Sequence, residues 1–196
     1  MVANSIIIIK VIRDRIRDHL YSTIDREQAG FRPESSCVDH INTLRIIEWH
    51  LVFVDFEKAF DSVDRERLWM ALRRRLSVIM STCNGAKCRV LHNATLSAAF
   101  VVGSGVRQGC ILSVLFLVVI GDIIQATIAQ QHSLYKYSGL TWKMDSFLQH
   151  LDYANDICLL SHSVLDAANM LYSLENEAAS FRLKINPVKT KKKKIF

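Results

Sequence analysis

Two short apolar runs, each joined to an acidic residue, form the clearest pattern along the chain. Val52–Val54 has the continuous apolar character of a buried strand and delivers Asp55 at its end. Ile157–Leu160 has the same character and predicts the returning arm of a hairpin whose tip is Ala154-Asn155-Asp156. If the two strands lie side by side, the acidic residues at their ends meet at one place.

Most of the remaining chain shows helical or strand periodicity. Helices are predicted at Ile7–Leu20, Val38–Trp49, Leu112–Ala129 and Val164–Phe181, and one more runs through Arg75 after a cap at Asp61 or Ser62. In the Val164–Phe181 helix the period places Leu165, Ala168, Leu171, Leu174 and Ala178 inward. Strands are predicted at Lys87–Leu91, Ala98–Val102 and Leu183–Asn186, and a loop or short strands at Gln131–Met144. We interpret Asp61 as a helix cap and not as a metal ligand.

The acidic ends of the two strands have the chemistry of a site for divalent metal ions. In two-metal phosphoryl transfer, ions about 3.5–4 Å apart clamp the attacking and leaving oxygens, so carboxylates from separate segments must converge. Asn155 lies beside Asp156 at the hairpin tip and offers a neutral carbonyl oxygen, but it supplies no negative charge.

Five segments carry a resemblance to a known family. They are DREQAGFRPESS at Asp25–Ser36, VDFEKAFDSVDRERLW at Val54–Trp69, GVRQGCILS at Gly105–Ser113, LDYANDICLLS at Leu151–Ser161 and FRLKINPVKTK at Phe181–Lys191. In this order they resemble the reverse transcriptases of non-LTR (LINE-type) retrotransposons. The order carries more weight than any single match, because five collinear segments leave little room for another family.

The resemblance implies an α+β fold, a polymerase palm in which helices back an antiparallel sheet, with partial fingers. Residues 1–48 and 80–107 would be fingers-like, 49–79 and 108–190 palm, and 191–196 a basic tail of the same single domain. The family makes DNA on an RNA template from a DNA primer, with Mg²⁺ and deoxynucleotide triphosphates. Because the sequence stops at Phe196, we expect no thumb.

The same resemblance assigns roles to individual residues. Asp55, Asn155 and Asp156 occupy the catalytic positions, and the metal ligands would be Asp55, the Phe56 carbonyl and Asp156. Phe60 matches the bulky residue under the sugar. The resemblance implies nucleotide-binding roles for Gln108, Arg107 and Arg32, and for Lys189 near the incoming phosphates. For Arg32 the alternative is a surface arginine fixed by a carboxylate such as Glu34.

Asn155 departs from the family pattern, which ends its metal hairpin in Tyr/Phe-Ala-Asp-Asp. Three carboxylates would give the site a charge of −3, whereas Asp55 and Asp156 alone give −2. Ionised ligands hold cations more strongly than neutral ones, so we expect little or no polymerase activity. The alternatives are a non-catalytic nucleic-acid-binding remnant and a functionless relic of such an element. The intervals Glu34–Val54 and Arg75–Asn84 are also shorter than the family commonly uses.

Charge favours an anionic partner. The formal net charge is +6, and the basic residues concentrate at Arg13, Arg15 and Arg17, at Arg73–Arg75, and at Lys189 with Lys191–Lys194. Nucleic acid fits this balance, although solvated helix faces explain such clusters equally well. Lys191–Lys194 itself is typical of a disordered tail or a nuclear-import-like patch.

The cysteines and the hydropathy indicate in which compartment we expect the protein. Five cysteines without a secretory signal fit a reducing, intracellular compartment, nuclear or cytoplasmic. Cys83, Cys88 and His92 do not form a zinc site, because the spacing provides no fourth ligand. Ile6–Ile9 and Ile111–Ile120 are too short to span a membrane, which takes about 20 residues, and they predict core elements.

Overall fold

The computed structural model describes residues 24–30, 32, 35–46, 50–73, 87–93, 95–101, 105, 114–134, 140–143 and 146–194. The helices are α2 (Cys37–Arg45), α3 (Ala59–Ser62), α4 (Arg65–Arg73), α6 (Val114–Leu134) and α7 (Val164–Ser180). The strands are β1 (His50–Val54), β2 (Lys87–Cys88), β3 (Leu91–His92), β4 (Thr95–Leu96), β5 (Phe100–Val101), β6 (Leu140–Lys143), β7 (Ser146–Leu148), β8 (His150–Tyr153), β9 (Asp156–Ser161) and β10 (Lys191–Lys194). The predicted helix at Ile7–Leu20 lies outside the described residues.

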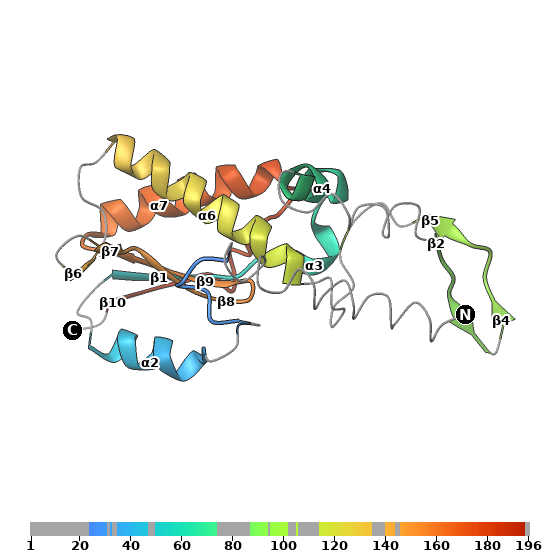
Figure 1. The fold of residues 1–196 in the computed structure, drawn as a ribbon, viewed down its shortest axis with the longest axis horizontal. Coiled ribbons are helices and arrows are strands. Elements are labelled where there is room, and N and C mark those ends of the chain that lie inside the picture. Colours follow the sequence, from blue (N-terminus) through green and yellow to red (C-terminus); the bar gives the residue numbers. More distant parts are fainter. Residues whose placement is uncertain are drawn as a thin grey trace.

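A four-stranded antiparallel sheet forms the centre of the fold. Its strand order is β10-β1-β9-β8, so the two predicted strands that end at the acidic residues are direct neighbours. Helices α6 and α7 cover one face of the sheet, and α2 lies on the other (Figure 1). This arrangement is the helix-backed antiparallel sheet that the sequence predicts.

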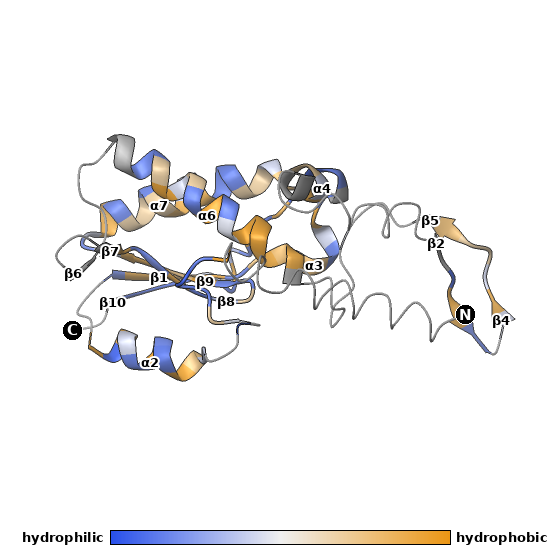
Figure 2. Cartoon of the chain, in the orientation of Figure 1, coloured by the Kyte–Doolittle hydropathy of each residue, from blue (hydrophilic) through white to orange (hydrophobic). Residues whose placement is uncertain are grey.

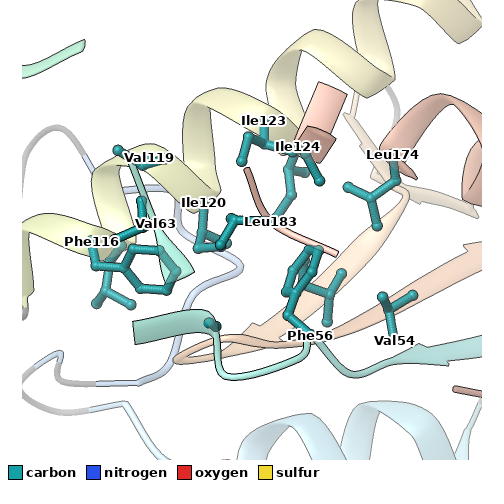
Figure 3. Close-up of a cluster of buried hydrophobic side chains, with 14 of the residues drawn as sticks. Val54, Phe56, Val63, Phe116, Val119, Ile120, Ile123, Ile124, Leu174 and Leu183 are labelled. Carbon is teal, nitrogen blue, oxygen red and sulfur yellow. The ribbon is translucent and has the colours of Figure 1, made fainter. Parts of the chain in front are cut away.

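The main core lies between the sheet and the helices α6 and α7. Residues Leu115–Ile120 of α6 are all nearly inaccessible, as are Ile123 and Ile124. They contact Val54 and Phe56 from the β1 side and Leu174 from α7 (Figure 3). The first half of α6 is correspondingly the most apolar stretch of helix in the fold, as Figure 2 shows. Full burial of one such side chain stabilises the fold by about 1.5–3 kcal/mol, so α6 anchors the sheet.

Helix α7 begins at the predicted residue, ends one residue before the predicted end, and buries only part of the predicted face, including Leu174 and Ala178. Its buried residues are Ala167, Met170, Ser173, Leu174 and Ala178. Leu165, predicted to point inward, is 66% exposed. Apolar residues occupy both faces of this helix at helical spacing. Packing against α6 and the sheet therefore determines which face is buried, and the periodicity of the sequence alone cannot predict it.

The prediction of a basic tail was wrong for Lys191–Lys194. These residues form β10 and pair antiparallel with β1, from Phe53↔Lys191 to His50↔Lys194. Backbone hydrogen bonding along the β1 edge outweighs the unfavourable composition, because an extended backbone pairs independently of its side chains. Leu183–Asn186, predicted to close the sheet, contributes only a bridge between Phe56 and Ile185.

The predicted helix after Asp55 is divided in two. Asp61 lies inside α3, so its assignment as a cap was wrong. Asp64 caps α4 instead, since its Oδ1 accepts hydrogen bonds from the backbone N–H groups of Glu66 (2.9 Å) and Arg67 (3.1 Å). The extended backbone of Val63 separates α3 from α4 and turns the chain between them.

The smaller predicted elements are partly confirmed. β2 lies within the predicted strand Lys87–Leu91, and β5 lies within the predicted strand Ala98–Val102. β2 pairs with β5, and β3, which begins at Leu91, pairs with β4. Helix α6 runs to Leu134, beyond the predicted end at Ala129, and β6 lies in the segment predicted as a loop or short strands. Among the described helices, none has the length and apolar character needed to cross a membrane.

Asp64 also forms an ion pair that ties α4 to the end of α7. Arg182 Nε lies 3.0 Å from Asp64 Oδ2, but the arginine side chain is 74% exposed. We expect Asp64→Ala to lower the free energy of unfolding by about 1–2 kcal/mol, because two backbone N–H groups lose their acceptor. Asp64→Asn keeps that acceptor, so it should cost about half as much or less. Urea denaturation measures both losses. Equal losses in the two variants would assign the effect to the ion pair and not to the cap.

Candidate active site

Asp55 and Asp156 come together where β1 and β9 end. The antiparallel register runs from His50↔Ser161 to Val54↔Ile157, so the next positions in register are Asp55 and Asp156. Directly opposed residues of an antiparallel pair have Cα atoms about 4.5–5.5 Å apart. The structure thus brings together the two carboxylates that the sequence predicted to converge.

The charge of Asp55 acts on Asp156. Partial burial and then the Asp55 carboxylate raise the pKa of Asp156, while the nearby Lys189 ammonium opposes this rise. Two like charges at this distance repel each other unless a cation lies between or beside them. The pair therefore has the electrostatic character of a cation site.

Asn155 completes the hairpin tip with an amide. Its Nδ2 group lies 3.4 Å from Asp156 Oδ1 and donates a long hydrogen bond to it. Within the part of the chain that the structure describes, no three His, Cys, Asp or Glu side chains gather closely enough to hold a metal ion. The donor set at this place is thus two carboxylates and one neutral amide, all oxygen donors of the kind that hard divalent ions prefer.

The segment after α7 fixes the backbone of Asp55. The Asn186 N–H donates to the Asp55 carbonyl (2.8 Å), and the Asp55 N–H donates to Thr190 Oγ1 (3.4 Å). The Asn186 side chain accepts from the N–H groups of Val188 and Lys189, which folds the turn that carries the lysine. Lys189 Nζ then lies 3.5 Å from Asp55 Oδ2, an oxygen that is buried and accepts no hydrogen bond.

Pairing at this point also orients Phe56. Glu57 N–H donates to the Lys184 carbonyl (2.8 Å), and the Asp55 carbonyl accepts from Asn186 N–H on the same side of the strand. Because polar groups alternate along a strand, the Phe56 carbonyl points to the opposite side, where β9 and Asp156 lie. The Phe56 side chain is buried in the core and holds this backbone in place (Figure 3).

The structure describes only some of the other predicted site residues. Phe60 is half-buried, and its ring packs against Phe116 of α6 with centroids 4.9 Å apart. Arg32 donates from Nη1 to the Asp25 carbonyl (3.0 Å). Glu34, the carboxylate considered as its partner, lies outside the described residues. Arg107 and Gln108 lie outside the described residues.

Gly105 shows where the segment that contains Arg107 and Gln108 begins. Its N–H donates to the Val63 carbonyl (2.9 Å), and a Cβ at this position would lie 2.7 Å from the Asp61 carbonyl oxygen. With φ of 76°, only glycine fits without strain. The segment Gly105–Ser113 therefore starts in contact with α3, the helix that follows β1 and Asp55 in the chain.

Two cavities are lined in part by Lys189, and the first of them reaches the aspartates. One, of about 330 Å³, lies between α2 and the sheet, has mostly apolar walls and reaches Asp55, Asp156 and Lys189. The other, of about 520 Å³, is lined by Phe56, Glu57, Lys58, Ser62, Arg182, Lys184, Asn186 and Lys189. Four of these side chains are basic and one is acidic, so the second cavity suits an anionic ligand.

A buried acid–histidine pair supports the hairpin, and sequence reasoning missed it. His150 Nε2 lies 3.5 Å from Asp152 Oδ2, and both side chains are almost fully buried on β8. Burial, followed by the charges of Asp25 and Glu27, raises the pKa of Asp152 well above its usual value. Burial also lowers the pKa of His150, although those two carboxylates partly oppose this. Burial therefore favours the uncharged form of both groups.

The segment that carries Asp25 and Glu27 is docked on the free edge of β8. Ala29 N–H donates to the Asp152 carbonyl (2.9 Å), and Asp152 N–H donates to the Glu27 carbonyl (3.0 Å). A short parallel bridge between Gln28 and Asp152 results. The first matching segment of the sequence thus lies beside the hairpin that carries Asp156.

Comparison with known proteins agrees with this geometry. The sequence pattern of the family described as reverse transcriptase (RNA-dependent DNA polymerase) matches residues 5–194. The Transposon TX1 uncharacterized 149 kDa protein of Xenopus laevis is 26% identical over 198 residues, which cover 92% of this chain and 15% of that protein. This chain therefore spans less than one sixth of that relative.

Solved telomerase structures share the fold. Apo telomerase from Candida tropicalis superposes with a TM-score of 0.60 at 12% identity, covering 99% of this chain and 37% of that one. Telomerase from Candida albicans in complex with the TWJ fragment of telomeric RNA gives a TM-score of 0.53 at 13% identity, covering 98% and 34%. At these identities the similarity shows the fold alone.

The raised pKa of Asp152 makes stability depend on pH in a defined direction. A carboxyl whose pKa is higher in the folded chain stabilises the fold fully below its unfolded value of 3.8, and this contribution falls as pH rises toward the folded value. We expect Asp152→Asn to raise the melting temperature by a few degrees at pH 7 and to have little effect near pH 4. Thermal melting across this range measures the difference. As a control, Glu175→Gln on the exposed face of α7 should leave the pH dependence unchanged; a parallel pH dependence of Asp152→Asn and the parent would contradict the burial argument.

Proposed function

The chain belongs to the reverse transcriptase (RNA-dependent DNA polymerase) family, and we propose that it is a polymerase domain of a non-LTR retroelement whose metal site is weakened by Asn155. One observation carries the proposal. Asp55 and Asp156 are cross-strand neighbours at the ends of β1 and β9, with an amide where a third carboxylate would complete the site.

The oxygen donors at this place fit Mg²⁺ in kind but are short of charge. Asp55, Asp156 and the Phe56 carbonyl would hold the ions, and the Asn155 carbonyl oxygen would add a neutral ligand. Two bound divalent ions would stabilise the charge that develops on the attacking and leaving oxygens. The buried Oδ2 of Asp55 accepts no hydrogen bond, and the Lys189 ammonium already places a positive charge 3.5 Å from it.

Deoxynucleotide triphosphates are the proposed substrate. The cavity of about 520 Å³ beside Phe56 presents Lys58, Lys184 and Lys189 to an anion. Phe60, which is half-buried and packs against Phe116, would lie under the sugar as the family pattern implies. Gln108, Arg107 and Arg32 keep the nucleotide-binding roles that the family pattern gives them, as proposals.

RNA template and DNA primer are the proposed macromolecular partners. The net charge of +6 supports binding to a phosphate backbone. An intracellular location, nuclear or cytoplasmic, follows the same proposal.

A second candidate is a nucleic-acid-binding domain without polymerase activity. The specific observation in its favour is the low charge of the metal site, where Asp55 and Asp156 stand beside an amide at Asn155. Binding would then show steep salt dependence, because phosphate contacts release counterions, and no primer would be extended.

Magnesium-dependent primer extension on an RNA template tests the proposal. We expect the native chain to extend weakly or not at all and Asn155→Asp to be faster by about 100-fold or more, since it restores a charged ligand. Asp55→Ala serves as the blank, and Asn155→Ala tests whether the amide contributes anything.

The outcomes separate the candidates. Extension by the native chain at the rate of Asn155→Asp would refute the weakened site. Failure of both chains, combined with salt-sensitive binding of the RNA–DNA duplex in fluorescence anisotropy, would favour the non-catalytic binder.

A further inference from the structure

Gln28 clamps the tip of the β8–β9 hairpin through its side-chain amide. Its Oε1 accepts the backbone N–H of Ala154 (2.7 Å), and its Nε2 donates to the Ala154 carbonyl (2.9 Å). The same Oε1 accepts the N–H of Gly30 (2.8 Å). Both polar atoms of the Gln28 side chain are therefore hydrogen-bonded, and the residue is only 3% exposed.

The clamped residue has an unusual backbone. Ala154 has φ of 58°, a left-handed conformation that residues with a Cβ rarely adopt. Gln28 bonds both polar groups of this residue, so it fixes the peptide planes on both sides of Ala154. The second of these planes leads directly into Asn155, and the next residue is Asp156. The amide thus sets the direction in which the tip presents its two polar side chains.

Gly30 shows how closely the two segments approach each other. A Cβ at Gly30 would lie 2.3 Å from the Ala154 nitrogen, a backbone atom that has no room to move away. Only glycine permits this contact. Gln28 and Gly30 therefore form one surface that is shaped to the turn at Ala154.

The segment that carries the clamp is itself fixed. Its bonds to Asp152 dock it on the β8 edge, and Gln125 of α6 donates to Asp25 Oδ2 (3.0 Å). Because α6 is the most buried helix of the core, the position of Gln28 is defined by the scaffold. A side chain held in this way can hold a turn in one conformation.

We propose that Gln28 is a positioning residue of the metal site, which acts through Ala154 to orient Asp156 toward Asp55. The proposal rests on the proposed function, since it assumes that the hairpin tip binds a cation. Outer-shell hydrogen bonds of this kind typically change metal affinity or activity by about 10- to 100-fold when they are removed.

Terbium luminescence tests the role without any need for polymerase activity. Tb³⁺ is a hard cation that takes oxygen ligands, and Tyr153 beside the tip is exposed and can sensitise its emission. Titrations use the Asn155→Asp chain, which has the full charge at the tip, and Asp156→Asn in that chain serves as the blank. We expect Gln28→Met to weaken Tb³⁺ binding by about tenfold or more.

A matched control separates positioning from general loss of stability. Gln131 on α6 is equally buried and donates from Nε2 to Ser173 Oγ (3.0 Å), away from the hairpin. Gln131→Met removes a buried glutamine hydrogen bond of the same kind, so it should lower the melting temperature without changing Tb³⁺ affinity. Titrations are made below the melting midpoint of every variant. Equal affinity of Gln28→Met and Gln131→Met would overturn the positioning role.

Gly30→Ala disturbs the same turn by a different route, because it removes no hydrogen-bonding group. We expect it also to weaken Tb³⁺ binding, and unchanged affinity in a folded Gly30→Ala chain would contradict the proposal. Primer extension then separates the two proposals. If Asn155→Asp binds Tb³⁺ in a Gln28-dependent manner but extends no primer, the positioning role stands and the polymerase function fails. If Asn155→Asp does not bind Tb³⁺, the positioning role fails together with the metal site.

Discussion

The antiparallel register of β1 against β9 is the constraint on which the site depends. It places Asp55 and Asp156 opposite each other at the end of two buried strands. Side chains alternate between the faces of a sheet, so a shift of one residue would send one of the carboxylates to the face covered by α6 and α7. The apolar residues of both strands resist such a shift, because they would lose their burial in the core. The same hydrophobic pattern that stabilises the sheet therefore aligns the acidic pair.

How much the sequence could predict follows from the range of each interaction. Local patterns gave β1, the β8–β9 hairpin and the bounds of α7, because each depends on periodicity within a few residues. The buried face of α7, the strand at Lys191–Lys194 and the cap at Asp64 depend on neighbours distant in the chain or on competition between equivalent polar residues. Gln28 had no signal of its own, since a glutamine in a polar loop is unremarkable until the turn at Ala154 lies beside it.

Acidic residues gather on both sides of the hairpin with different consequences. On the side of β1, Asp55 and Asp156 remain accessible, and the exposed Lys189 moderates their repulsion. On the side of the docked segment, Asp152 is buried near Asp25 and Glu27, and the pKa of its carboxyl is raised well above the usual value. Burial thus separates the carboxyls into an accessible pair at the ends of β1 and β9 and a buried carboxyl, Asp152, whose uncharged form is favoured and which packs as part of the scaffold.

The lysine side chains of β10 also affect the association of the sheet with other chains. Among the described strands, β10 has a partner on one side only, so its outer backbone groups form an edge of the sheet. An open edge invites the strand of another chain, and the pairing of two copies would bring rows of ammonium groups face to face. Their mutual repulsion disfavours that contact, so the lysine run protects the sheet against edge-to-edge aggregation while its backbone completes the fold.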